Sequence, residues 1–215
     1  MLTISESITK VLEITHWDEV YTAKTETGVS WYQSEPTRSL ELIDAVAPAE
    51  GGRIIDVGGG ASVLVDRLLA LPFGRVAVLD ISEIALGKAK SRLGERAGRV
   101  EWLTADVTAV RSFGTFDGWH DRALFHFLTD EADREKYVGL ALRTVPRGRH
   151  LIIATFADDG PERCSDLEVR RYSAEALSAA FSPEFSLAGA VGETHTTPWG
   201  SLLPFVYGVF RRQDD

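Results

Sequence analysis

Hydrophobic and polar positions follow two patterns along this chain: short β-branched runs, and longer segments with apolar residues at helical spacing. The runs predict strands over residues 53–57, 75–80, 99–106, 116–123 and 149–157. The longer segments predict helices over residues 5–24, 36–47, 62–70, 83–93, 130–143 and 173–181. Strands that alternate with helices are typical of a parallel sheet built from βαβ units.

The pattern changes after residue 157. Residues 158–172 are polar and rich in turn-forming residues, and two more strands are predicted over 185–193 and 201–212. The seven residues THTTPWG that join these two strands are too few for a crossover helix, so the pair must be antiparallel. The predicted fold is α/β and Rossmann-like, with a seven-stranded sheet of five parallel strands and a C-terminal antiparallel hairpin, flanked by helices.

Composition narrows the functional classes. The length of 215 residues favours a single domain, and the formal net charge of −9 disfavours a broad nucleic-acid surface. Cys164 is the only cysteine, which rules out an internal disulfide and favours a reducing, cytoplasmic compartment. The N-terminus has no signal-peptide pattern, and no apolar run is long enough for a membrane span, so no membrane partner is expected. Abundant Ala, Gly, Arg and Leu suggest a GC-rich bacterial genome.

A glycine-rich turn, Gly58-Gly59-Gly60, follows the first predicted strand. Glycine allows positive φ and a close approach of ligand to backbone, and the helix that follows offers free N–H groups to an anion. Ser62 stands where a further glycine would complete G-x-G-x-G. We expect Ser62 to take helical φ/ψ or to cap the helix, so that the turn is kept. By itself, this turn is a weak signal, and the alternative is a plain tight turn.

Acidic residues end the next two strands, and parallel strands place ligands at their carboxyl ends. Asp80 ends the second strand, 24 residues after Asp56, and its carboxylate can accept hydrogen bonds from both hydroxyls of a ribose. Asp106 ends the third strand and can accept a hydrogen bond from an adenine amino group. Each aspartate alone is more often a helix cap or a solvated loop residue. The spacing also fits nicotinamide cofactors, although G-x-G-x-x-G is out of register here.

Four motifs, DVGGGAS, VLDIS, TADVT and FDGWHDRALFHFL, together with the terminal hairpin, resemble the class I S-adenosylmethionine-dependent methyltransferases of the small, single-domain bacterial type. The resemblance implies S-adenosylmethionine as the cofactor and S-adenosylhomocysteine as its product. It implies a helical cap over residues 1–47, a cofactor-binding core over 48–157 and a substrate-side closing part over 158–215. It assigns cofactor contacts to Asp56, Gly58, Gly60, Ser62, Asp80, Ile81, Asp106, Val107, Trp31 and Tyr32.

The fourth strand ends in polar residues that are candidates for catalysis. His120 and Arg122 share one face of the strand, and Asp121 lies on the other, where members of the family often place a polar residue beside the reacting methyl group. His120 or His126 is a candidate general base because histidine titrates near neutral pH. The alternative is that both histidines are hydrogen-bonded core residues. No histidine pair has ligand spacing with nearby carboxylates, so no metal site is expected.

Other polar and aromatic side chains are candidates for the substrate side. Trp17 and Tyr21 share a helical face and are expected to fasten the first helix to the sheet. The substrate candidates are Arg122, Arg163, Tyr172, His195 and Trp199.

Three functions stay open. The motifs and the absence of an appended recognition module favour a methyltransferase that acts on a small molecule. A protein lysine methyltransferase is the first alternative, because an acidic rim could attract a basic target segment. The W-D-x-x-Y pattern near the N-terminus loosely resembles both bacterial small-molecule methyltransferases and lysine methyltransferases that act on elongation factors. A non-catalytic methyltransferase-fold subunit or cofactor sensor is the second. Absence of N-P-P-[YF] after the fourth strand further disfavours a DNA amino-methyltransferase.

Overall fold

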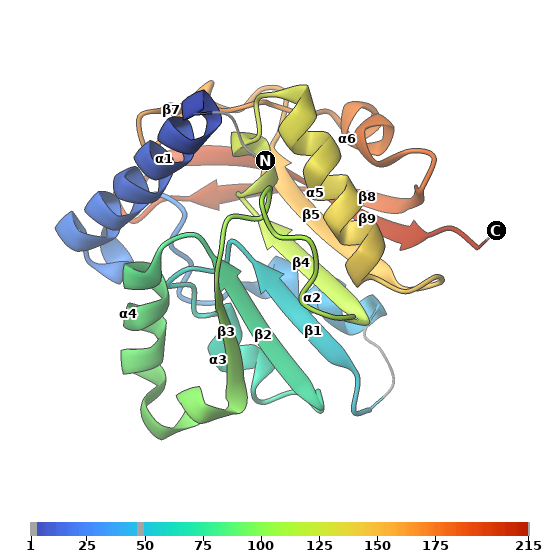
Figure 1. The fold of residues 1–215 in the computed structure, drawn as a ribbon, viewed down its shortest axis with the longest axis horizontal. Coiled ribbons are helices and arrows are strands. Elements are labelled where there is room, and N and C mark those ends of the chain that lie inside the picture. Colours follow the sequence, from blue (N-terminus) through green and yellow to red (C-terminus); the bar gives the residue numbers. More distant parts are fainter. Residues whose placement is uncertain (1–3, 47–49, 215) are drawn as a thin grey trace.

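A mixed seven-stranded sheet forms the centre of the molecule (Figure 1). The computed structural model describes residues 4–46 and 50–214, with side chains described from residue 12 onward. The strand order is β3-β2-β1-β4-β5-β9-β8. The parallel strands are β1 (Arg53–Val57), β2 (Arg75–Asp80), β3 (Val100–Thr104), β4 (Gly118–Arg122) and β5 (His150–Phe156). Strand β9 (Leu202–Arg212) runs antiparallel to both β5 and β8 (Phe185–Thr196), which confirms the predicted fold class.

Helices cover both faces of the sheet, so successive residues of its central strands are buried on opposite sides. One face packs on α5 (Glu131–Thr144) and α6 (Ala174–Phe181), through residues such as Val57 and Trp119. The other face packs on α2 (Thr37–Val46), α3 (Leu64–Leu68) and α4 (Glu83–Leu93), through residues such as Ile54 and Val78. The apolar runs of β1 and β2 follow from this burial on both sides.

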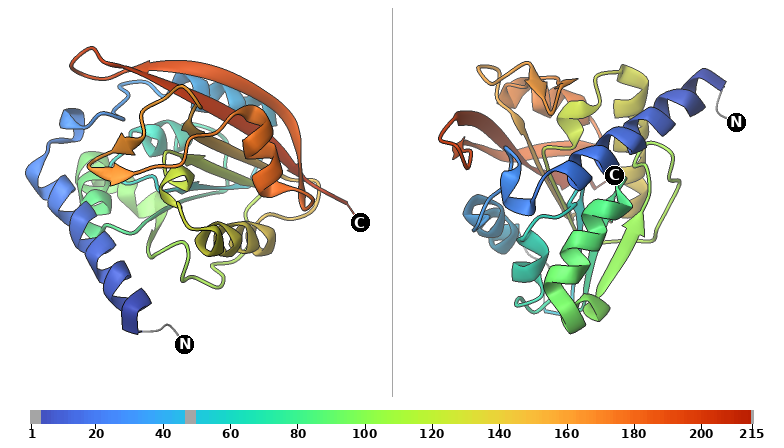
Figure 2. Two further views of the ribbon diagram at one scale, coloured as in Figure 1. Left: turned by 90° about the horizontal axis from the view of Figure 1, so that it is seen from above. Right: turned by 90° about the vertical axis from the view of Figure 1, so that its left-hand side faces the viewer.

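Helix α1 (Ile4–Ala23) lies beside α4, on the side of the sheet's carboxyl ends (Figures 1 and 2). Asp18 accepts a 2.6 Å hydrogen bond from the hydroxyl of Ser82. The same Ser82 oxygen accepts a hydrogen bond from the amide of Ala85, which makes Ser82 the N-cap of α4, as predicted. The cap therefore also fastens α1 over the ends of the strands.

Several short elements differ from the prediction. The helix expected from residue 62 begins only at Leu64, and the third and fourth strands are shorter than predicted at both ends. A two-stranded hairpin, β6 (Arg163–Cys164) and β7 (Leu167–Glu168), stands in the segment predicted to be loop. Short 3-10 turns cover η1 (Glu26–Gly28), η2 (Gly94–Arg99) and η3 (Phe125–Phe127). Residue 47, the expected end of the second helix, lies outside the described residues.

No helix in the part of the chain that the structure describes is both long enough and apolar enough to cross a membrane.

Candidate active site

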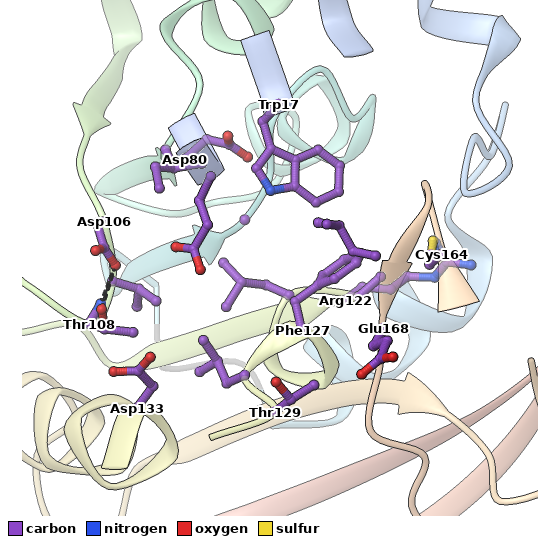
Figure 3. Close-up of a pocket in the computed structure, with 18 of the residues that line it drawn as sticks. Trp17, Asp80, Asp106, Thr108, Arg122, Phe127, Thr129, Asp133, Cys164 and Glu168 are labelled. Carbon is purple, nitrogen blue, oxygen red and sulfur yellow. Dashed lines mark hydrogen bonds between the residues drawn. The ribbon is translucent and has the colours of Figure 1, made fainter. Parts of the chain in front are cut away.

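A cavity of about 290 Å³ lies at the carboxyl ends of β1, β2 and β4, where the strand order reverses (Figure 3). This reversal is where open α/β sheets bind ligands. Asp106 and Thr108 lie at one end of the cavity in Figure 3, and Arg122 and Cys164 at the other. Asp80 lies between these two ends, so the acidic strand ends predicted from the sequence line one cavity.

The glycine turn after β1 forms part of the cavity wall. Gly58 and Gly60 have φ of 72° and 49°, a conformation that residues with a Cβ rarely adopt. A Cβ on Gly58 would lie 2.7 Å from the side chain of Leu124, and one on Gly60 would lie 2.7 Å from the Tyr21 hydroxyl. The turn therefore needs glycine at both positions, for its backbone conformation and for space.

Asp80 ends β2 with its carboxylate at the cavity wall, and only 7% of the residue is exposed. Its Oδ1 atom accepts a 2.8 Å hydrogen bond from the amide of Ser82. Burial raises the pKa of this carboxyl to about 7, although hydrogen bonds from backbone amides oppose the shift. Asp80 thus titrates close to neutral pH.

Asp106 is held by the residue two positions later. The amide and the hydroxyl of Thr108 each donate a 2.8 Å hydrogen bond to Oδ1 of Asp106. Val107, Leu124 and Leu128 add apolar groups to the lining of the cavity. An oriented carboxylate beside apolar walls suits a flat ring that carries a hydrogen-bond donor.

Aromatic rings from three separate segments cover the middle of the cavity. Trp17 packs edge-on against Phe127, with ring centroids 5.0 Å apart, and against Trp31 at 5.9 Å. Tyr21 packs against Trp31 at 6.2 Å. Trp17 and Tyr21 were expected only to fasten the first helix. They also line the cavity, as does Trp31.

A smaller cavity of about 50 Å³ lies on the other side of Gly58 and Trp31. Asp56, Tyr32 and Ser62 line it, so these predicted cofactor residues lie beside the glycine turn but not in the larger cavity. Ser62 is not the N-cap of α3, because that position is Val63. The Ser62 hydroxyl instead accepts a 3.1 Å hydrogen bond from the amide of Leu64, and so still satisfies one free amide of the helix start.

His120 joins three elements through its ring. Nδ1 lies 2.7 Å from Asp56 Oδ1, and Nε2 lies 2.9 Å from the hydroxyl of Ser39 on α2. All three residues are almost fully buried. Both ring nitrogens of His120 are therefore engaged, which suits a residue that positions Asp56 better than one that takes a proton from a substrate.

The two other catalytic candidates are buried and line neither cavity. Asp121 accepts hydrogen bonds from the Tyr137 hydroxyl at 2.6 Å and from the amide of Leu124 at 3.0 Å. His126 Nδ1 accepts a hydrogen bond from the amide of Phe156 at 3.3 Å. Burial, assisted by the charge of Arg122, lowers the pKa of His126 to about 3. Its imidazole is thus neutral at physiological pH.

Of the predicted substrate residues, only Arg122 lines the larger cavity. His195 is buried at Ser30, to whose carbonyl its Nε2 is hydrogen-bonded, and Tyr172 is buried against Phe125. Arg163 and Trp199 are exposed and do not line this cavity.

Several cavity residues were not singled out from the sequence: Glu13, Thr108, Leu124, Phe127, Leu128 and Glu168. The apolar run after the fourth strand, ALFHFL, was the available signal for three of them, and it reads equally well as core. The β6–β7 hairpin brings in Glu168, and nothing in the local sequence indicated that hairpin.

Comparisons with known proteins agree with this geometry. Residues 54–148 match the family described as a methyltransferase domain. The UbiE C-methyltransferase of ubiquinone and menaquinone biosynthesis from Paracoccus denitrificans is 35% identical over 32% of this chain and 29% of its own length. The mouse eEF1A lysine and N-terminal methyltransferase is 26% identical over 55% of this chain and 17% of its own length. The chain thus spans less than a third of either relative.

Solved structures share the fold across nearly the whole chain. The N-methyltransferase NodS of Bradyrhizobium japonicum WM9, in complex with S-adenosylhomocysteine, has a TM-score of 0.71 at 14% identity, over 92% of this chain and 98% of its own. The domain match and this shared fold agree with the methyltransferase family that the sequence motifs indicated.

Proposed function

Because this chain carries a class I S-adenosylmethionine-dependent methyltransferase domain, we propose that it transfers a methyl group from S-adenosylmethionine to a small molecule. When bound, this cofactor supplies a methyl group already activated by a sulfonium. In the proposed arrangement, Asp106 faces the adenine, Asp80 the ribose, and the turn at Gly58 the methionine part. The covered space beside Arg122 then receives the acceptor, in line with the methyl group.

The residues present fit such a cofactor. Asp80 can accept hydrogen bonds from two ribose hydroxyls when it is ionised, and the carboxylate of Asp106 is oriented by Thr108. Gly58 has no side chain, so the cavity wall there leaves space that a Cβ atom would occupy. Trp17 and Trp31 cover the cavity and exclude water from the reacting atoms.

The cavity supports a transfer driven by alignment. Cys164 lines the cavity. Burial raises the pKa of its thiol to about 11, so the thiol stays protonated at physiological pH. His120 uses both ring nitrogens, and His126 lies outside the cavity. We therefore expect an acceptor that is nucleophilic without proton removal by a histidine. Alignment of acceptor and methyl group can supply much of the rate enhancement.

One observation carries the preference for a small acceptor: the end of the cavity beside Arg122 is covered. Cys164 is only 7% exposed there, and Trp31 and Phe127 close the space from other sides. A small molecule can enter such a space whole, whereas a protein could place only one extended side chain there.

The second candidate function is methylation of a protein lysine. The exposed acidic residues Glu13, Asp130 and Glu168 lie at the mouth of the cavity, where a basic segment of a protein would be attracted. The likeness to a mouse eEF1A methyltransferase supports the same candidate.

Transfer of isotopically labelled methyl groups from S-adenosylmethionine separates these functions. The protein is incubated with the small-molecule fraction and, separately, with the protein fraction of a bacterial lysate. We expect labelled product and S-adenosylhomocysteine from the small-molecule fraction. Label on protein bands alone would instead support lysine methylation. Binding of S-adenosylhomocysteine without turnover on either fraction would support a cofactor sensor.

Asp80→Asn provides the matched test of the site. It should weaken cofactor binding and transfer by about tenfold or more, because the amide keeps one acceptor oxygen and replaces the other with an NH2 donor. The control is Asp44→Asn on the exposed side of α2, which should leave both unchanged. Folded wild-type protein that does not bind S-adenosylhomocysteine in calorimetry would overturn the proposed function.

A further inference from the structure

Arg122, the last residue of β4, is unusual among the cavity residues. It is the only lysine or arginine among the described residues that line the larger cavity, and it also lines the smaller one. Only 9% of its side chain is exposed. A buried cation at the covered end of the site calls for a partner of opposite charge.

The protein satisfies this guanidinium only in part. Nε donates a 2.9 Å hydrogen bond to the Tyr207 hydroxyl, and Nη1 donates a 3.2 Å hydrogen bond to the carbonyl of Trp31. Nη2 is buried and has no hydrogen-bond partner among the described residues. Buried polar atoms are hydrogen-bonded in the large majority of native structures, so this guanidinium lacks a partner that the described residues do not supply.

Glu193 partly balances the charge of Arg122 without completing its hydrogen bonds. Its Oε2 lies 3.8 Å from Nη2, which is an ion pair too long for a hydrogen bond. The same oxygen accepts a 2.8 Å hydrogen bond from Tyr207, and Glu193 does not line the larger cavity. Glu193 therefore holds the guanidinium in place and weakens, but does not abolish, its attraction for an anion.

The surroundings hold the guanidinium in one orientation. It stacks on the ring of Phe205, with Cζ 4.4 Å from the ring centroid. Cys164 and Ala123 line the same end of the cavity and carry no charge there, because the Cys164 thiol stays protonated. A fixed guanidinium whose charge Glu193 balances only in part is suited to recognise a carboxylate.

We propose that Arg122 binds a carboxylate group of the methyl acceptor, so that the acceptor is a small organic acid. This inference rests on the proposed function and names the substrate class of the same site. The covered position of Arg122 and its free Nη2 donor are the observations that carry it. Glu168 lies on the same side of the cavity as Arg122 in Figure 3, but it is exposed to solvent, which screens its charge.

A second carboxylate could compete for this donor, namely that of the methionine part of the cofactor. Arg122 also lines the smaller cavity beside Gly58 and Ser62. The two sources differ in one measurable respect. Loss of Arg122 weakens the binding of S-adenosylhomocysteine itself only if the cofactor's carboxylate is the partner.

The test uses three ring compounds that differ in one group: 4-hydroxybenzoate, the neutral 4-hydroxybenzamide and the cationic tyramine, with acetate and benzoate as further carboxylates. Binding is measured on the protein saturated with S-adenosylhomocysteine, by calorimetry and by the fluorescence of the tryptophans that line the cavity. We expect the carboxylates to bind in the millimolar range or tighter, and at least about tenfold more tightly than the amide or the amine.

Two variants make the test specific. Arg122→Gln should lower the affinity for the carboxylates by at least about tenfold. Its affinity for S-adenosylhomocysteine should stay within about threefold of the wild-type value. Glu193→Gln should tighten the carboxylates by about threefold or more, because it removes a negative charge beside Nη2. The direction of this second change does not depend on whether the Arg122 variant folds well.

Three results would overturn the inference: equal binding of the amide and the carboxylate, no binding of any carboxylate, or a loss of S-adenosylhomocysteine affinity in Arg122→Gln with the carboxylates unaffected. In all three the wild-type protein still binds S-adenosylhomocysteine, so the proposed function survives. Failure of the wild type to bind S-adenosylhomocysteine would instead count against the proposed function.

Discussion

The hydroxyl of Tyr137 on α5 donates a 2.6 Å hydrogen bond to the carboxylate of Asp121 on β4. The same hydroxyl accepts a 2.9 Å hydrogen bond from the indole of Trp119. All three side chains are almost fully buried, and none lines either of the two cavities described above. Asp121 therefore acts in the packing of α5 on the sheet, although its position at the end of the fourth strand had suggested catalysis.

Removal of this hydroxyl should lower stability and leave cofactor binding unchanged. Tyr137→Phe leaves a buried carboxylate and a buried indole N–H each without one partner, which should lower the free energy of unfolding by about 1–3 kcal/mol. Urea denaturation measures the loss, and calorimetry with S-adenosylhomocysteine measures binding.

Tyr172→Phe is the matched control for this experiment. The Tyr172 hydroxyl is buried but has no hydrogen-bond partner among the described residues, so its removal should be neutral or stabilising. A large loss of affinity for S-adenosylhomocysteine in Tyr137→Phe, at unchanged stability, would contradict a packing role for Asp121.

Cofactor affinity should depend on pH through Asp80. Burial raises its pKa to about 7, and the ionised carboxylate offers two acceptor oxygens to the ribose hydroxyls, whereas protonation turns one of them into an O–H donor. The dissociation constant of S-adenosylhomocysteine should therefore rise as pH falls below about 7, by up to about tenfold per pH unit, and should level off above that pH. Calorimetry from pH 5.5 to 8.5, values chosen about the pKa, checks this.

The same shift predicts an opposite effect on folding. Between pH of about 4 and 7 the native state keeps the Asp80 proton that the unfolded chain has lost, so this group lowers stability as pH rises through that range. Asp80→Asn should remove both dependences. A pH profile of binding that persists unchanged in Asp80→Asn would assign the titration to another group.

The sequence predicted best those elements whose ends carry a local signal. Strands β1 and β2 have the predicted bounds, because β-branched runs meet a glycine turn and an aspartate there. Helix α4 also begins where Ser82 can cap it. The turn of the β6–β7 hairpin places Ser165 and Asp166 at φ of 48° and 63°. The hairpin was not predicted because these two residue types do not indicate such a turn, whereas an Asn-Gly pair would.

In the site, the sequence indicated the residues at the strand ends but not the direction of every side chain. Asp80 and Asp106 reach the cavity because parallel strands end along one edge of the sheet. The inward direction of Asp121 depends on Tyr137, 16 residues later in the chain. The role of Trp17 in covering the cavity likewise depends on Phe127, which packs against it from another element.

Gly58→Ala should damage the site through one contact. The new Cβ would lie 2.7 Å from the side chain of Leu124, a cavity residue, at a φ of 72°. Displacement of Leu124 should lower the affinity for S-adenosylhomocysteine by about tenfold or more. Calorimetry and thermal unfolding together measure affinity and stability.

Gly94→Ala separates backbone strain from this contact. Gly94 has a φ of 58°, and no atom of the described residues lies within 4 Å of the methyl group that alanine would add there. The substitution should therefore cost about 1–2 kcal/mol of stability and leave affinity unchanged. Equal affinity losses in the two variants would show that backbone strain, and not the approach to Leu124, limits binding.

His126 should not contribute to the pH dependence of turnover. Its Nδ1 accepts a hydrogen bond from the amide of Phe156 on β5, and its pKa is lowered to about 3, chiefly by burial. His126→Asn offers an oxygen near the position of Nδ1 and should keep the pH profile of kcat/KM. His126→Leu leaves the amide of Phe156 unpaired and should lower stability by about 1–3 kcal/mol. If the dependence of kcat/KM on pH near neutrality disappeared in His126→Asn, His126 would again be a candidate general base.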